Sequence, residues 1–197
     1  MVTSIFINIL AYSMKQFSFF IVVALALGCT ASIDIQSGNL DNWSRSRYLT
    51  ETSSSPRAID LNKDGILDII LGAGAREFEA TDAAVLALNG ANGEILWKVS
   101  GRNQMVGSAI FKDVTADGVP DVFIGGRSAQ FVAINGFTGE VLWEYLKAEA
   151  SLESHKDTTM LNFFNPQFIP DQNGDGVEEI LTAFGGYVYA LPDELGR

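Results

Sequence analysis

The sequence predicts an all-β fold made of four-stranded antiparallel units that repeat along the chain. Short apolar runs are separated by Gly, Asn or Asp, which is the pattern of strands joined by tight turns. The chain also aligns with itself over three segments, and such self-similarity defines an architecture before any single strand does. A content of 19 Gly and only 5 Pro in 197 residues suits a loop-rich β protein better than a helical bundle.

The repeats set the expected domain organisation. The first runs from Arg57 to Val99 and the second from Ala109 to Tyr145, and each holds four apolar runs. The third starts near Pro166 and reaches Arg197 without a fourth run, so we expect it to be partial. Tandem four-stranded units of about 40 to 50 residues are the signature of a β-propeller. The expected fold is therefore a β-propeller fragment with two complete blades and one partial blade, which further blades would close.

The inner strands and the fourth strand are expected to form the core. Runs such as Ile69 to Leu71 and Val122 to Ile124 are continuously apolar instead of alternating, so both faces of these strands should be buried. Trp97 and Trp143 take equivalent positions on the fourth strand. Packing between neighbouring sheets is the favoured interpretation of both rings, and a sugar-stacking platform is the alternative.

Three acidic nonapeptides precede the second strand of each unit and carry the predicted chemistry. Side-chain oxygens recur at positions one, three, five and nine, and Gly at position six allows a sharp bend. The backbone carbonyl of position seven can add a further oxygen. Calcium takes about six to eight oxygen ligands, whereas magnesium demands tighter octahedral geometry. We therefore expect up to three Ca²⁺ ions, held by Asp60, Asn62, Asp64, Ile66 and Asp68; by Asp113, Thr115, Asp117, Val119 and Asp121; and by Asp171, Asn173, Asp175, Val177 and Glu179.

Two alternatives compete with a calcium loop of this type. An EF-hand needs a Glu at position twelve and flanking helices, but position twelve is Leu71, Ile124 or Thr182, and strands are expected on either side. Metal-free Asp-Gly turns held by side-chain hydrogen bonds remain the alternative. Three copies at equivalent positions favour calcium. The second nonapeptide is the weakest, because Thr115 offers a neutral hydroxyl.

The motifs resemble two known families. The stretch D-x-N-x-D-G-x-x-D with its following strand resembles the FG-GAP repeat of integrin alpha-subunit propellers and related bacterial surface proteins. The stretch V-L-A-L-N-G-A-N-G-E-I-L-W resembles the PQQ-like propeller repeat. Both resemblances cover residues 57–197, and both imply a propeller with four-stranded blades.

Residues 1–29 have the pattern of an export signal. Lys15 precedes an apolar run from Phe17 to Gly28, and the run ends at the chain's single cysteine, Cys29. This ending resembles the lipobox of bacterial lipoproteins, which would make Cys29 the lipidated first residue of the mature chain. A plain signal peptide and an uncleaved anchor are the alternatives, and Met14 is a candidate true start. Residues 30–56 are expected to form a polar tether.

The charge and the lack of catalytic motifs bound the function. The net charge of −11 disfavours nucleic-acid binding. Nine of the 24 acids are loop ligands, which leaves 15 acids against 13 bases, so the excess is local. No nucleophile or general base lies in a recognisable motif, and His155 lies in a polar insertion without a partner motif.

We therefore expect a non-enzymatic binding or scaffold module, exported to the bacterial cell envelope as an outer-membrane or surface lipoprotein. Its partner would be a protein or glycan at the cell surface. The alternatives are a fragment of a propeller enzyme, of the quinoprotein dehydrogenase or polysaccharide lyase type, and a lipoprotein resembling an outer-membrane assembly factor.

Overall fold

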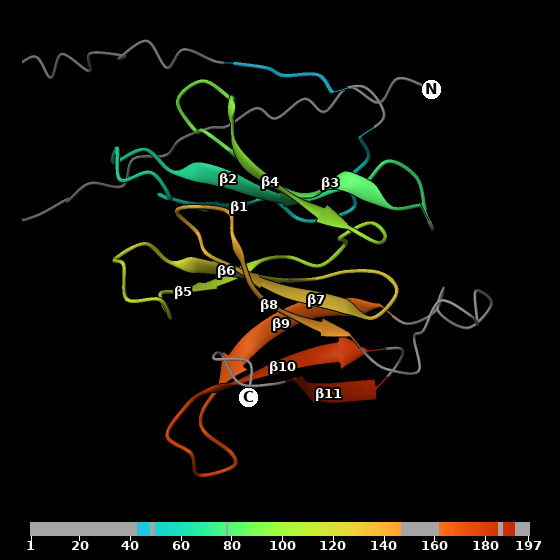
Figure 1. Ribbon diagram of the computed structural model, residues 1–197, viewed down its shortest axis with the longest axis vertical. Helices are drawn as coiled ribbons and strands as arrows, with labels where there is room; N and C mark the ends of the chain where they lie inside the picture. Colours follow the sequence, from blue (N-terminus) through green and yellow to red (C-terminus); the bar gives the residue numbers. More distant parts are fainter. Residues whose placement is uncertain (1–42, 48–49, 78, 147–161, 185–186, 192–197) are drawn as a thin grey trace, which may run out of the picture. The chain divides into compact units, whose positions relative to one another are not determined.

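The computed structural model describes residues 43–47, 50–77, 79–146, 162–184 and 187–191. These residues confirm the predicted all-β class, because every regular element among them is a strand (Figure 1). All the sheets lie within residues 47–197, and the fold of this part of the chain is described below. Among the described residues no helix is long and apolar enough to cross a membrane.

The described strands form three antiparallel sheets, and none of these sheets closes on itself. The first sheet has the order β1-β2-β3-β4, the second β5-β6-β7-β8 and the third β11-β10-β9. The elements are β1 (Arg57–Ile59), β2 (Asp68–Gly72), β3 (Thr81–Leu88), β4 (Ile95–Gly101), β5 (Ile110–Lys112), β6 (Asp121–Gly125), β7 (Gln130–Ile134), β8 (Val141–Leu146), β9 (Phe163–Ile169), β10 (Glu179–Phe184) and β11 (Tyr187–Leu191).

The first two sheets share the same pairing, apart from an additional register shift between Thr81 and Val85 at the start of β3. The first strand ends opposite the last acid of its loop, with Ile59 facing Asp68 in one sheet and Lys112 facing Asp121 in the other. Both sheets shift register one residue before the end of the third strand. An irregularity that recurs at the same point of two sheets shows that the repeat seen in the sequence is a structural repeat.

The first repeat extends upstream of Arg57. Glu51 and Gly74 exchange two backbone hydrogen bonds of 2.7 and 3.0 Å. The second repeat has a bond in the equivalent place, where Arg127 N donates to Gln104 O at 3.0 Å. Ser54 is also buried, and its hydroxyl donates to Gly107 O at 2.7 Å. Residues 51–56, at the end of the expected tether, therefore contact the sheets.

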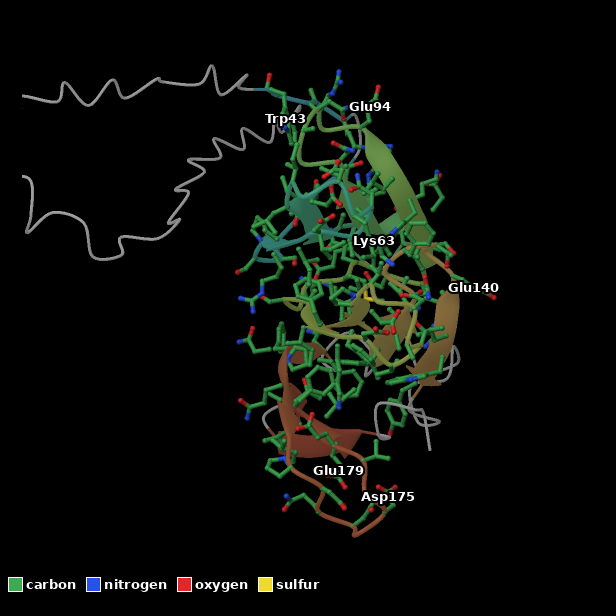
Figure 2. The ribbon with its side chains drawn as sticks, turned by 90° about the vertical axis from the view of Figure 1, so that its left-hand side faces the viewer. Trp43, Lys63, Glu94, Glu140, Asp175 and Glu179 are labelled. Carbon is green, nitrogen blue, oxygen red and sulfur yellow. The ribbon has the colours of Figure 1, made fainter. Side chains whose placement is uncertain are left out.

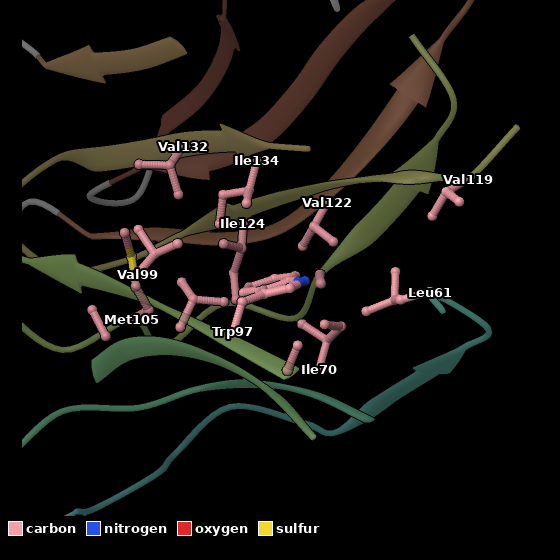
Figure 3. Close-up of a cluster of buried hydrophobic side chains, with 14 residues drawn as sticks. Leu61, Ile70, Trp97, Val99, Met105, Val119, Val122, Ile124, Val132 and Ile134 are labelled. Carbon is pink, nitrogen blue, oxygen red and sulfur yellow. The ribbon is translucent and has the colours of Figure 1, made fainter. Parts of the chain in front are cut away.

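The core lies between successive sheets, as the apolar runs predicted. β2, β6 and β7 are buried along their whole length. One cluster joins the first sheet to the second and contains Ile70, Val85, Trp97, Val122 and Ile134 among others (Figure 3). A second cluster joins the second sheet to the third through Phe123, Phe131, Phe163 and Ile180, among others. Each such side chain contributes about 1.5 to 3 kcal/mol when fully buried.

The core interpretation is confirmed for Trp97, whereas Trp143 is only half-buried. Trp97 is 9% exposed, and its Nε1 donates to Gly136 O, in the turn between β7 and β8, at 2.8 Å. The ring also packs on Gly139, where an added Cβ would lie 2.6 Å from Trp97 Cγ. Trp143 packs on Phe123 and Phe131, with ring centroids 6.1 and 6.0 Å apart. Trp97 is therefore covered and offers no sugar-stacking platform.

Backbone hydrogen bonds between neighbouring sheets also follow the repeat. Met105 N donates to Ala73 O at 3.0 Å, and Phe163 N donates to Gly126 O at 2.9 Å. These two bonds lie at equivalent positions in successive repeats. The contact between the first and second sheets is therefore repeated between the second and third sheets.

Several expectations concern segments outside the described residues. These are the export signal with Met14 and Cys29, residues 30–42 of the tether, the insertion around His155, and residues 192–197 after β11.

Candidate metal-binding loops

Each predicted nonapeptide connects the first and second strands of its sheet. Acidic loop 1 is residues 60–68, acidic loop 2 is residues 113–121 and acidic loop 3 is residues 171–179. In each loop the position-nine residue is the first residue of the following strand. Figure 2 shows Asp175 near the tip of loop 3 and Glu179 closer to the sheet.

The three loops share an unusual backbone. Positions four and six both have left-handed φ angles, which L-residues other than Gly rarely adopt. Position six is Gly in every loop, with φ between 80° and 88°. Position four is Lys63 (φ 62°), Ala116 (φ 58°) or Gly174 (φ 83°). The loops therefore keep this conformation even where position four is Lys63 or Ala116, whose side chains disfavour a left-handed φ.

Two carboxylates hold the same backbone amides in every loop. Position one accepts the N–H of position six, and position five accepts the N–H of position seven. The position-one bonds are Gly65 N to Asp60 (3.0 Å), Gly118 N to Asp113 (2.9 Å) and Gly176 N to Asp171 (2.8 Å). The position-five bonds are Ile66 N to Asp64 (2.8 Å), Val119 N to Asp117 (2.8 Å) and Val177 N to Asp175 (2.9 Å).

The position-nine carboxylate is buried in all three loops. Asp68 and Asp121 are 0% exposed and Glu179 is 7% exposed. Each accepts the N–H of position two, from Leu61 (2.9 Å), Val114 (2.8 Å) or Gln172 (2.8 Å). These hydrogen bonds offset the cost of burying a charge.

The same carboxylate reaches the turn between the third and fourth strands. Gly90 N donates to Asp68 at 2.9 Å, and Gly136 N donates to Asp121 at 3.1 Å. The turn packs so closely on the loop that a Cβ at Gly90 would lie 1.9 Å from Leu67 O. Gly136 is equally confined. The two sequence motifs, which resemble different families, are thus parts of one hydrogen-bonded unit.

Hydrogen bonding lowers the pKa of two exposed loop carboxyls. The N–H groups of Gly176 and then Gly174 lower the pKa of Asp171 below its usual range. The Asn135 amide, followed by the N–H of Val119, lowers the pKa of Asp117. A calcium ligand must be deprotonated, so the shift at Asp171 favours the charge state that a cation requires.

Loops 1 and 3 carry donor sets that fit calcium. Each offers three carboxylates and an Asn amide oxygen. A carboxylate oxygen has two lone pairs, so one that accepts an N–H can still bind a cation. In the described part of the chain, however, no three acidic, His or Cys side chains converge as metal ligands. The structure therefore brings positions one, five and nine into one loop but does not direct them to a common point.

Loop 2 departs from the other two. Thr115 Oγ1 donates to Asp121 at 3.3 Å. Asn135 Nδ2, from the turn after β7, donates to Asp117 Oδ2 at 2.9 Å and to Thr115 Oγ1 at 3.3 Å. Lys63 of loop 1, which is labelled in Figure 2, donates from its Nζ to the backbone oxygen of Asp117 at 2.9 Å. Sequence reasoning missed the roles of Asn135 and Lys63; the only signal for Asn135 was its place in the repeated Asn-Gly turn.

Neither the protein-family models nor the curated proteins compared with this chain give a match. The FG-GAP and PQQ-like resemblances stay expectations drawn from the motifs.

Proposed function

We propose that this chain is part of a calcium-stabilised β-propeller, a non-enzymatic binding module exported to the bacterial cell envelope. The propeller arrangement is supported by the repeated packing step between sheets. Ile70 of the first sheet and Phe123 of the second lie at equivalent repeat positions, and each packs toward the next sheet. A step that recurs with equivalent residues is what an array of identical blades requires.

The observation that carries the calcium proposal is the threefold recurrence of one loop conformation. The same φ pattern and the same position-one, position-five and position-nine hydrogen bonds appear in all three loops. In loop 1 the residues that would hold the ion are Asp60, Asn62, Asp64, Asp68 and the carbonyl of Ile66. Bound Ca²⁺ would supply a divalent charge that offsets the repulsion between crowded carboxylates.

A binding role is supported by exposed apolar side chains beside these loops. Ile66 and Leu67 of loop 1 and Phe137 of the β7–β8 turn are 46%, 60% and 56% exposed. Loops on a rigid scaffold commonly carry binding residues, and exposed apolar groups suit a protein or glycan partner. Lipidation at Cys29 would hold the module at the membrane surface.

Thermal unfolding with calcium and with a chelator tests the proposal. An ion at about 100 times its Kd stabilises the native state by about 2.7 kcal/mol. For a domain of this size that corresponds to a Tm higher by roughly 5 to 10 °C in calcium. Magnesium at the same concentration is the control, and we expect a smaller shift. Equal Tm values in calcium and chelator would contradict the proposal.

A further inference from the structure

The side chains at positions three and five have a different hydrogen-bond donor in loop 2 than in loop 1. In loop 2 the Asn135 amide donates to both side chains, Thr115 and Asp117, at 3.3 and 2.9 Å. A calcium loop directs the oxygens of positions three and five at its ion. An amide NH₂ group has two hydrogens to donate, and Asn135 uses both on these two oxygens.

The orientation of the Asn135 amide is fixed by its other end. Asn135 Oδ1 accepts the backbone N–H of Thr138 at 2.8 Å and the Thr138 hydroxyl at 3.0 Å. A backbone N–H can only donate, so the oxygen must face Thr138 and the NH₂ group must face loop 2. Asn135 is 8% exposed, which leaves it little freedom to turn away.

Lys63 adds a positive charge to the same loop. Its ammonium donates to Asp117 O at 2.9 Å, and a Cβ at Gly118 would lie 3.4 Å from it. The ammonium therefore lies against positions five and six of loop 2. The equivalent residue of loop 2 is Ala116, which has no cation to extend toward loop 3.

Loop 1 lacks this amide contact. Asn89 is the repeat equivalent of Asn135, but its Oδ1 accepts the N–H of Ala91 at 2.8 Å. In the described part of the chain no hydrogen bond joins the Asn89 amide to Asn62 or Asp64. Instead, Asn62 Nδ2 donates to Asp64 Oδ2 at 2.9 Å. The turns also differ in sequence, because the first repeat has Asn92 where the second has Thr138, whose hydroxyl donates to Asn135 Oδ1 at 3.0 Å.

We infer that Asn135 and Lys63 take the place of a cation in loop 2, so that this loop keeps its shape without metal and calcium binds only to loops 1 and 3. The inference rests on the proposed function and changes the expected number of ions from three to two. Loop 2 would then connect the first two sheets whether or not calcium is present, whereas loops 1 and 3 would be stabilised by bound calcium.

Calcium titration of the full chain by isothermal calorimetry tests this inference. The matched variants are Asp60→Asn, Asp113→Asn and Asp171→Asn, because each alters the same position-one hydrogen bond. We expect two equivalents for the wild type, one each for the loop 1 and loop 3 variants, and two for Asp113→Asn. Circular dichroism checks that each variant is folded.

The outcomes separate the inference from the proposed function. Loss of one equivalent in Asp113→Asn overturns the inference and leaves the calcium proposal standing. No calcium binding by the wild type or any variant defeats the calcium proposal itself.

A gain-of-site variant gives an independent readout. Lys63→Gly, Thr115→Asn and Asn135→Ala combined give loop 2 the donor set of loop 1 and remove both competing groups. A third equivalent of bound calcium is expected. A folded variant that still binds two ions would contradict the role assigned to Asn135 and Lys63.

Discussion

Asp68 accepts the backbone N–H of Gly90 at 2.9 Å, although 22 residues separate them in the sequence. This bond joins acidic loop 1 to the turn between β3 and β4. Asp121 and Gly136 repeat it in the second sheet at 3.1 Å, and Gly136 also accepts the indole N–H of Trp97. The loop, the turn and the tryptophan of the preceding sheet therefore form a chain of contacts that crosses from one sheet to the next.

Removal of the buried position-nine carboxylate should destabilise the fold even without calcium. Asp68→Ala leaves the N–H groups of Leu61 and Gly90 without their acceptor. We expect a loss of about 2 to 4 kcal/mol, because each buried unsatisfied donor costs about 1 to 3 kcal/mol. Urea unfolding in chelator measures it. The control is Asp64→Ala, at an exposed position, which should cost under about 1 kcal/mol. Equal losses of stability in the two variants would contradict the role of Asp68 as the acceptor that joins the loop to the turn.

Gly136, in the turn between β7 and β8, should not tolerate a side chain. A Cβ at Gly136 would lie 2.0 Å from Pro120 O, so Gly136→Ala must move backbone. We expect a loss of about 3 kcal/mol, at the upper end for overpacking. Gly65→Ala is the matched control, because a Cβ there meets nothing within 4 Å and only its φ of 83° opposes the change. That variant should lose about 1 to 2 kcal/mol, and the urea midpoints should rank in this order.

Trp97→Phe should weaken the contact between the first and second sheets. The substitution leaves Gly136 O without the indole N–H and opens a small cavity in the core. The expected loss is about 2 to 3 kcal/mol. Trp143→Phe, at the equivalent but less buried position, should cost less. Chemical unfolding followed by circular dichroism compares the stability of the two variants. An equal or greater loss of stability for Trp143→Phe would count against the role of Trp97 in the contact between the first and second sheets.

The exposed pair of Asp82 and Lys98 should contribute to stability in a pH-dependent way. A hydrogen bond and the charge of Lys98 lower the pKa of Asp82 below its ordinary value of 3.8. Since the folded-state pKa is the lower one, the contribution is present above pH 3.8 and is lost as pH falls through the folded-state pKa. Asp82→Asn should therefore be less stable than wild type at neutral pH, and the difference should vanish in acid. A difference in Tm that does not change with pH would contradict this assignment.

The sequence predicted the strands and loops because both depend on local chemistry. Gly and Asn mark the turns, and the continuous apolar run of β6 predicts its burial on both faces. Gly at position six also predicted the bend that all three loops make there, whereas the left-handed φ at position four was not predicted.

The contacts that distinguish loop 2 could not be predicted in this way. Asn135 meets Asp117 because β6 and β7 pair in a particular register, and the turn after β7 then folds back over the loop. In both repeats the Asn oxygen accepts a backbone N–H of its own turn, from Thr138 in the second and from Ala91 in the first, but only the Asn135 amide also donates to the loop. Periodicity carries no information on that difference.

Hydrogen exchange of the full chain with calcium and with chelator tests the central claim most directly. The claim is that acidic loops 1 and 3 bind calcium and are stabilised by it. Calcium should slow amide exchange in peptides covering residues 60–68 and 171–179, where the N–H groups of Gly65 and Gly176 already bond to carboxylates. Residues 113–121 should exchange at the same rate in both conditions. Identical exchange of loops 1 and 3 with and without calcium would contradict the account.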